Sequence, residues 1–253
     1  MLPPIKKIVA IGGGKIRTEG TFDIDKQIVR LSKKKRPKFL FIPTASSDSE
    51  NYWKYINLYY GEKLGCRTDV LFLLKDEPSL KLIKEKILSA DIIYVGGGNT
   101  LMMMKLWRRL GVDVLLRRAW EQGTVLCGIS AGSICWFESG HSDSLSFYNA
   151  KKWHYINVCG LGFLKGIHCP HYNSETLGVP RKRNFYHMIQ KVGDMGIAID
   201  NNCAIEFLDD TFRVITSKKY AKAFRVFKKN GKVVSQRIPQ VDGPTPIATL
   251  FIQ

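Results

Sequence analysis

The sequence predicts a single α/β domain in which a mostly parallel sheet lies between layers of helices, with a β-hairpin near the C-terminus. Three observations support this fold class. Short apolar segments alternate with amphipathic segments through the first half of the chain, which is the pattern of strand–helix–strand units. The expected strands are apolar on both faces, as in a parallel sheet covered by helices. Near the end, valine-rich segments flank Asn230-Gly231, a dipeptide that favours a hairpin turn.

The elements of the first half follow one another regularly. Residues 5–11 (IKKIVAI) are expected to form a buried strand, and Gly12-Gly13-Gly14 a turn. A helix is expected at 22–32, where apolar residues recur on one face. Further strands are expected at 38–43, 69–74, 91–95 and 125–129, and further helices at 52–64, 79–88, 101–110 and 115–122.

The pattern changes after Ser133. Residues 144–160 are polar and aromatic, which favours a long loop or a hairpin. We found no linker and no repeat, so the sequence predicts one domain over residues 1–253. Short strands are expected around 162–167, 196–199, 203–207 and 212–215, and the terminal hairpin at 223–234.

Composition and cysteine usage indicate an ordinary globular protein in a reducing compartment. Hydrophobic residues make up 45% of the chain and charged residues 24%. No apolar run approaches the ~20 residues that span a bilayer, and the N-terminal segment resembles a first strand more than a signal peptide. The six cysteines are scattered without a C-x-x-C pair. We therefore expect free thiols and a cytoplasmic location, with no membrane partner.

The formal net charge of +17 favours anionic partners. Basic clusters occur at 33–36, at 181–183 and between residues 218 and 237, so the excess is spread along the chain. No nucleic-acid module is visible: there is no paired Cys/His finger, no RNP-like aromatic strand and no basic region joined to heptads. We interpret the charge as a solvated basic surface and expect no nucleic-acid partner.

The strongest local motif is Gly128-Ile129-Ser130-Ala131-Gly132, a G-x-S-x-G that directly follows an apolar strand. This strand–turn–helix context holds a serine in a sharp elbow and lifts its hydroxyl above the sheet edge. Small flanking residues are needed because the strand and the helix come close. The sequence therefore predicts that Ser130 is a nucleophile and that the N–H of Ala131 faces a developing oxyanion.

A glycine-rich segment, Val95-Gly96-Gly97-Gly98-Asn99-Thr100, follows another expected strand. Ligands in open α/β sheets bind at this edge, and consecutive glycines let backbone N–H groups approach a substrate oxygen. Gly98 is therefore a candidate for the second oxyanion donor, and Gly97 and Asn99 are candidates for substrate binding. A phosphate loop is the alternative, but no Gly-Lys-Ser/Thr and no G-x-G-x-x-G follows.

The segment 166–172 (GIHCPHY) supplies the imidazole that a serine hydrolase needs as a base. His168 and His171 could instead be metal ligands, but no third ligand stands at a convincing spacing. We expect no metal and no cofactor.

Together these blocks resemble the peptidase E family of serine peptidases, which includes the cyanophycinases and has the flavodoxin-like fold of class I glutamine amidotransferases. The matching blocks cover most of residues 5–215: VGGGNT (95–100), GISAGS (128–133), PHY (170–172) and GIAIDNNCAIEF (196–207). The resemblance implies Ser130 as nucleophile, His171 as its base, and Gly98 with Ala131 as the oxyanion hole. Glutamine amidotransferases carry cysteine at the elbow, so Ser130 argues against glutaminase activity.

The family hydrolyses peptide bonds beside aspartate, and one of its arginines follows the histidine by about a dozen positions and holds the aspartate carboxylate. The resemblance implies this role for Arg183, which stands beside Arg181. The predicted function is thus hydrolysis of small acidic peptides, in particular of dipeptides that begin with Asp. An esterase or amidase, a catalytically silent binder of a small acidic ligand, and a nucleic-acid-binding protein are the alternatives; the chain could be a monomer or a homodimer.

The acid that orients His171 is less well defined by the sequence. Cyanophycinase-like relatives carry Glu where this chain has Asn201. Asp143, close to where peptidase E places an aspartate, is the predicted acid. Glu206 and Glu138 are the alternative acids. A further alternative is a Ser–His pair without an acid, in which Asn201 orients His171 as a neutral group.

Overall fold

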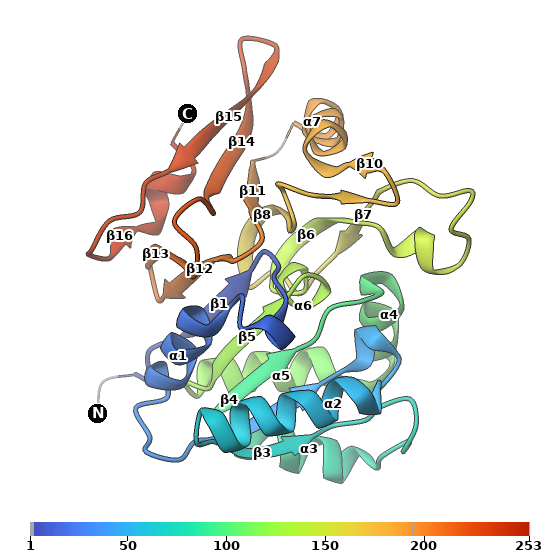
Figure 1. Ribbon diagram of the computed structural model, residues 1–253, viewed down its shortest axis with the longest axis vertical. Coiled ribbons are helices and arrows are strands. Elements are labelled where there is room, and N and C mark those ends of the chain that lie inside the picture. The colour runs from blue at the N-terminus through green and yellow to red at the C-terminus, as the bar shows by residue number, and fades with distance from the viewer. Residues whose placement is uncertain (1–2, 194, 253) are drawn as a thin grey trace.

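The computed structural model describes residues 3–193 and 195–252 and contains two large sheets. An eight-stranded sheet has the order β16-β13-β12-β1-β5-β4-β2-β3, and a six-stranded sheet has the order β15-β14-β11-β8-β6-β7. Figure 1 shows the parallel strands of the larger sheet with their helices in the lower half and the smaller sheet with α7 (Arg181–Val192) in the upper half. The predicted α/β class with a mostly parallel central sheet is confirmed, while the assignment to one domain stays a prediction.

The larger sheet is parallel where the sequence predicted strands alternating with helices. Four of its seven pairings, those joining β1, β5, β4, β2 and β3, are parallel. The other three, at β12, β13 and β16, are antiparallel. The strands are β1 (Lys7–Ile11), β2 (Lys38–Ile42), β3 (Arg67–Val70), β4 (Ile92–Val95), β5 (Val125–Ile129), β12 (Cys203–Leu208), β13 (Thr211–Thr216) and β16 (Thr245–Pro246).

Alternate side chains of the parallel strands enter two different cores. Ile8 and Ala10 of β1 belong to a cluster with α3, α4 and α5, whereas Val9 and Ile11 belong to a cluster with α1 and α2. Burial on both faces explains why these strands are continuous apolar runs. The helices are α1 (Phe22–Leu31), α2 (Glu50–Ile56), α3 (Leu80–Ser89), α4 (Thr100–Leu110), α5 (Val112–Glu121) and the short α6 (Ala131–Ile134); the π-helix η3 (Asn57–Lys63) continues α2, and 3-10 turns η1 (Ile16–Thr18) and η2 (Thr44–Ser46) follow β1 and β2.

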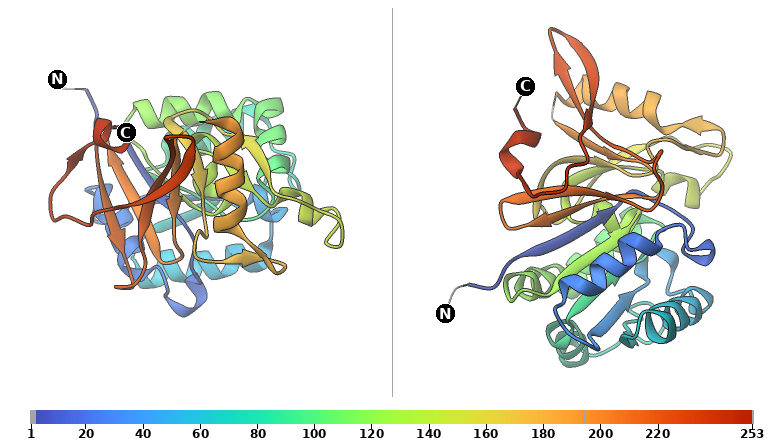
Figure 2. Two further views of the ribbon diagram at one scale, coloured as in Figure 1. Left: turned by 90° about the horizontal axis from the view of Figure 1, so that it is seen from above. Right: turned by 60° about the vertical axis from the view of Figure 1, so that its left-hand side comes forward.

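The second half of the chain forms the smaller sheet, which lies above the larger one in the right-hand view of Figure 2. The hairpin around Asn230-Gly231 is confirmed, and both turn residues have positive φ (50° and 77°). Its strands are β6 (Phe137–Ser142), β7 (Ile156–Cys159), β8 (Leu164–Cys169), β11 (Gly196–Ile199), β14 (Ala223–Lys229) and β15 (Lys232–Ile238); β9 (Glu175–Thr176) pairs with β10 (Val179–Pro180), and η4 (Ser144–Phe147) and η5 (Ile247–Leu250) are single 3-10 turns.

Several elements differ from the predicted ones, among them β6, which the sequence did not predict. Helix α7 (Arg181–Val192) was not predicted, because only Phe185 and Ile189 form its buried apolar face among many polar residues. Strand β3 begins before the expected 69–74 and is only partly buried, since it lies at the sheet edge. All six cysteines are free, as predicted. Within residues 3–193 and 195–252, no helix has the length and apolar character to cross a membrane.

Candidate active site

Ser130 follows β5 and has the strained geometry that a nucleophile elbow requires. Its φ is 58° and its ψ is −114°, which is a rare conformation for a residue with a side chain. Its backbone N–H donates to the carbonyl of Ile11, at the end of the neighbouring β1, over 3.2 Å. Ser130 thus stands at the carboxyl edge of the parallel strands, half exposed, as predicted.

The glycines of the motif are needed because the backbone of α6 lies in close contact with the backbones of β4 and β5. A Cβ atom on Gly132 would collide with the carbonyl oxygen of Val95, and one on Gly128 would collide with the carbonyl oxygen of Gly132. These neighbours are backbone atoms, which cannot rotate away. The predicted close approach of strand and helix is therefore confirmed.

His171 lies beside the same strand end. It follows β8, has a φ of 51°, and its backbone N–H donates to the carbonyl of Gly12 over 2.9 Å. Ser130 and His171 are thus bonded to the consecutive carbonyls of Ile11 and Gly12. The structure thus anchors the backbones of the predicted nucleophile and the predicted base at consecutive residues of one strand end, although 41 positions separate them in sequence.

The imidazole of His171 is oriented by Asn201. Its Nδ1 lies 2.6 Å from the side-chain oxygen Oδ1 of Asn201, and because a carbonyl oxygen only accepts, Nδ1 carries the proton. The lone pair is then on Nε2, which is the tautomer that a general base needs. Burial, and then the charge of Arg181, lower the pKa of His171 to about 4, so the ring is neutral at neutral pH.

The prediction that Asp143 orients His171 is wrong in this structure. The Oδ2 atom of Asp143 accepts from Arg181 Nη2 at 2.5 Å and from Thr176 Oγ1 at 2.9 Å. Burying the guanidinium requires a counter-charge, and Asp143 supplies it. The neutral alternative, Asn201, is the group that contacts the imidazole.

The two other acids considered also have structural partners. Glu206 is 1% exposed and binds Arg213 through two hydrogen bonds of 2.7 and 3.0 Å. Glu138 is exposed and accepts from the backbone N–H of Gly166 over 2.7 Å. Neither carboxylate is bonded to His171.

The predicted oxyanion donors lie next to Ser130. A Cβ atom on Gly97 would be 3.3 Å from Ser130 Cβ and 3.8 Å from its Oγ, so the glycine segment passes beside the nucleophile. Gly98 has a φ of 138°. Across the described residues, the backbone N–H groups of Gly98 and Ala131 have no hydrogen-bond acceptor. Both are therefore available for an oxygen bound beside Ser130.

Two predicted substrate-binding residues have other positions. Asn99 is 5% exposed, and its Oδ1 accepts from the N–H of Met102 over 3.0 Å, so it caps α4. Arg183 is exposed on α7 and makes no polar contact with the described site residues. Asn99 thus caps a helix instead of facing a substrate. No contact among the described residues supports substrate binding by Arg183.

Both ring nitrogens of His168 have protein partners, one of them in the turn after Ser130, so His168 is not placed as a metal ligand. Its Nδ1 lies 2.9 Å from the carbonyl oxygen of Ile197, and its Nε2 lies 2.8 Å from Ser133 Oγ. Both ring nitrogens are thus occupied, and burial lowers the pKa of the ring to about 3. Ser133 lies in the first turn after Ser130, so this buried bond ties the elbow to β8.

Sequence reasoning missed one group of residues beside His171. Lys15, Lys218 and Tyr220 line a cavity of about 500 Å³ that opens on His171 and Asn201. Lys15 directly follows the first glycine triplet, and Lys218 opens the loop after β13. Their positions after strand ends were the available signal, but the sequence could not show that these two strand ends meet.

Two known bacterial proteins resemble this chain, one of them over nearly its whole length. It is 38% identical over 241 residues to the uncharacterized peptidase YgaJ of Bacillus subtilis, covering 93% of this chain and 98% of that protein. It is 29% identical over 135 residues to the uncharacterized peptidase Lmo0363 of Listeria monocytogenes, covering 53% of this chain and 65% of that protein.

Solved structures share the fold. A peptidase from an acI-B1 actinobacterium superposes with a TM-score of 0.70 at 21% identity, over 96% of this chain and 97% of that chain. A putative peptidase E protein from Listeria monocytogenes gives a TM-score of 0.55 at 21% identity, over 93% and 100%. The sequence pattern of peptidase family S51 matches residues 8–215, which include Ser130, His171 and Asn201. The chain therefore belongs to peptidase family S51, and the prediction of a peptidase is confirmed.

Proposed function

We infer that this peptidase is a serine hydrolase of small peptides that begin with Asp, with Ser130 as nucleophile and His171 as general base. One observation supports this most: the amides of both residues are bonded to consecutive carbonyls at the end of β1, and Asn201 fixes the base tautomer of His171. Nucleophile, base and orienting group are the arrangement that nucleophilic catalysis requires.

The reaction follows from this arrangement. His171 Nε2 accepts the proton of Ser130 Oγ as Oγ attacks the carbonyl carbon of the substrate. The oxyanion accepts hydrogen bonds from the N–H groups of Gly98 and Ala131. The imidazolium then donates its proton to the leaving amine as the peptide bond breaks. A water molecule, deprotonated by His171, releases the acyl group from Ser130.

Preference for an acidic substrate is supported by the charge around the site. Lys15 and Lys218 line the cavity beside His171, and no Asp or Glu is among its lining residues. The chain as a whole carries +17. A positive cavity concentrates anionic substrates and raises their association rate.

An esterase is the second candidate, and the low basicity of His171 favours it. A base with a pKa of about 4 takes a proton from serine less readily than an ordinary histidine. An ester, whose leaving group needs less assistance, depends less on this base. Turnover of Asp-X, Glu-X and β-aspartyl dipeptides, compared with that of a p-nitrophenyl ester, separates the two candidates.

The substitution Ser130→Ala tests the central role. We expect kcat to fall by about 10⁶ for every substrate, because nucleophile and base act as one unit. The thermal unfolding midpoint should change little, since the hydroxyl makes no hydrogen bond to the described residues. A fluorophosphonate probe should label the wild type and not the variant. Near wild-type turnover in the variant would remove Ser130 from the mechanism.

A further inference from the structure

The cavity beside His171 lies next to the contact between the imidazole and Asn201. Its lining includes His171 and Asn201 but not Ser130. Since Nδ1 of His171 faces Asn201, the cavity opens on the Nδ1 side of the base. A carboxylate stands on this side of the imidazole in a Ser–His–Asp triad. The remaining lining residues are Gly14, Lys15, Thr18, Gly20, Asn202, Lys218 and Tyr220.

Four polar groups of this cavity are hydrogen-bond donors without an acceptor among the described residues. Lys15 and Lys218 are exposed, and neither has an ion pair with any described residue. Tyr220 OH accepts from Asn202 Nδ2 over 3.4 Å, which leaves its own proton free to donate. The Nδ2 group of Asn201 has no acceptor among residues 3–193 and 195–252, because its contact with His171 is made through Oδ1.

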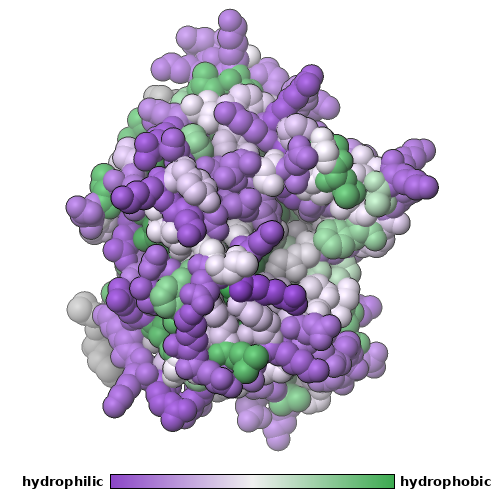
Figure 3. Space-filling model, in the orientation of Figure 1, coloured by the Kyte–Doolittle hydropathy of each residue, from purple (hydrophilic) through white to green (hydrophobic). Residues whose placement is uncertain are grey.

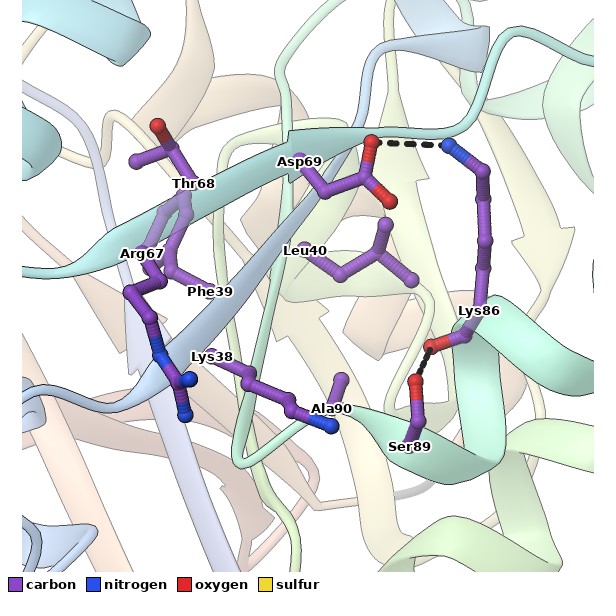
Figure 4. Close-up of a pocket in the computed structure, with 9 residues that line it drawn as sticks. All are labelled: Lys38, Phe39, Leu40, Arg67, Thr68, Asp69, Lys86, Ser89 and Ala90. Carbon is purple, nitrogen blue, oxygen red and sulfur yellow. Dashed lines mark hydrogen bonds and ion pairs between the residues drawn. The ribbon is translucent and has the colours of Figure 1, made fainter.

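Another basic cavity of the molecule, unlike the cavity beside His171, has a carboxylate in its lining. The cavity of about 290 Å³ at the opposite edge of the sheet, drawn in Figure 4, is lined by Lys38, Arg67 and Lys86 together with Asp69. There Lys86 Nζ is paired with Asp69 Oδ1 at 2.7 Å. The cavity beside His171 has two lysines and no carboxylate in its lining. Both linings thus have two more cations than carboxylates, but only the cavity beside His171 has no carboxylate in its lining.

We propose that this cavity, here called the Lys15–Lys218 pocket, binds a small carboxylate that accepts a hydrogen bond from Asn201 Nδ2 and supplies the negative charge that the His171–Asn201 pair lacks. The lysines and Tyr220 hold the anion. The Asn201 amide then connects it to Nδ1 of His171, and the base becomes stronger when the anion is bound. The other charged groups near the ring, Arg181 and Asp143, are paired with each other and do not change with the anion.

The carboxylate could come from the substrate itself or from solution. Binding is measured first, by NMR titration of the wild-type protein with sodium acetate and with succinate, against sodium chloride at equal ionic strength. We expect saturable shifts of the Asn201 side-chain amide and the His171 ring. The double variant Lys15→Met/Lys218→Met should bind about 10-fold more weakly, because two charge-assisted contacts are lost. Lys38→Met, in the opposite cavity, is the matched control and should bind like the wild type.

Turnover distinguishes the two sources. With a neutral p-nitrophenyl ester, acetate should raise kcat several-fold in the wild type and in Lys38→Met, and not in the double variant. With an Asp-X dipeptide, competition by acetate identifies the substrate carboxylate as the occupant, whereas stimulation identifies a free anion. Absence of saturable binding, equal binding by the double variant, or binding that leaves ester turnover unchanged would overturn the proposal.

This inference rests on the proposed function for its catalytic part only, and the two can fail separately. If acetate binds in the Lys15–Lys218 pocket but no substrate is hydrolysed, the anion site stands and the hydrolase mechanism fails. If substrates are hydrolysed through Ser130 but no anion binds, the mechanism stands and the anion site fails.

Discussion

At the scale of single residues, Asn201 decides how strong the base is. An amide fixes the Nδ1–H tautomer of His171 as well as a carboxylate does, through a contact of 2.6 Å. It cannot neutralise the imidazolium that forms when Ser130 is deprotonated. Burial and the nearby Arg181 act in the same direction, and the pKa of His171 falls to about 4. The site therefore has the correct tautomer but a weak base.

The substitution Asn201→Asp should strengthen this base. A carboxylate at position 201 favours the charged imidazole and raises the pKa of His171 from about 4. His171 acts only when deprotonated, so the acid limb of the kcat/KM profile should move to higher pH. Above that limb kcat should rise by at least about 10-fold, because the converse change in a triad is costly. A profile with the acid limb unchanged would show that Asn201 does not control His171.

We expect Asp143 to contribute mainly to the stability of the fold. The substitution Asp143→Asn leaves Arg181, which is 3% exposed, without its counter-charge. Breaking a buried pair in this way costs about 3 kcal/mol of unfolding free energy. Urea denaturation measures this loss, and the double variant Asp143→Asn/Arg181→Met should recover part of it. An unchanged unfolding free energy together with a large loss of kcat would restore Asp143 as a catalytic acid.

At the scale of elements, the elbow depends on how closely α6 approaches β4. The backbone contact at Gly132 permits no side chain. The bond from Ser133 Oγ to His168 then holds the same turn against β8 of the smaller sheet. The two sheets are thus joined directly behind the nucleophile, and the strained φ of Ser130 is maintained from both sides.

The substitution Gly132→Ala should disrupt this contact. The added methyl group would collide with the carbonyl oxygen and carbon of Val95, so β4 or α6 must shift. We expect a loss of stability of about 1–3 kcal/mol, as for overpacking, and a fall in kcat greater than the rise in KM. Gly243→Ala is the control, because nothing lies within 4 Å of its added Cβ atom. Gly132→Ala with wild-type stability and kcat would contradict the close packing.

At the scale of the whole molecule, charge is distributed unevenly between surface and interior. The face shown in Figure 3 is largely hydrophilic, with hydrophobic groups in small separate areas. This agrees with a solvated basic surface; the absence of a nucleic-acid partner stays a prediction. In the interior, Asp25 of α1 is fully buried and accepts hydrogen bonds from Thr21, Tyr59 and Tyr60.

Asp25 should make global stability depend on pH. Burial raises the pKa of Asp25 from 3.8 to about 6, although its three hydroxyl partners lower it. Because the folded state holds the proton more tightly, this contribution to stability is complete below about pH 4 and is lost as pH rises through about 6. The loss is roughly 3 kcal/mol.

The variant Asp25→Asn isolates this contribution. The difference in unfolding free energy between wild type and variant, measured by urea denaturation, should change by roughly 3 kcal/mol between about pH 4 and pH 7, with the wild type losing more. A difference that is constant over this range would mean that Asp25 keeps the same charge in the folded and unfolded states.

The sequence by itself determined the parallel half of the fold and pointed to Ser130 and His171 as the residues proposed to react. The strands are apolar on both faces because both faces are covered, so their runs are visible without a structure. Ser130 was predicted because it follows an apolar strand in a G-x-S-x-G motif at the carboxyl edge of the sheet, and His171 was chosen over His168 by the family resemblance. Helix α7 was missed, because its buried face is too narrow to give a periodic pattern.

Only the tertiary structure decided which groups surround His171. Asp143, Asn201 and Glu206 are all carboxylates or amides, and their spacing in sequence does not tell which one reaches Nδ1. The fold pairs Asp143 with the buried guanidinium of Arg181 and pairs the buried carboxylate of Glu206 with Arg213, because a buried charge needs a counter-charge, and this leaves Asn201 at the base. The Lys15–Lys218 pocket likewise depends on the tertiary structure. The loops after β1 and β13 meet because both strands pair with β12, which lies far from β1 in sequence.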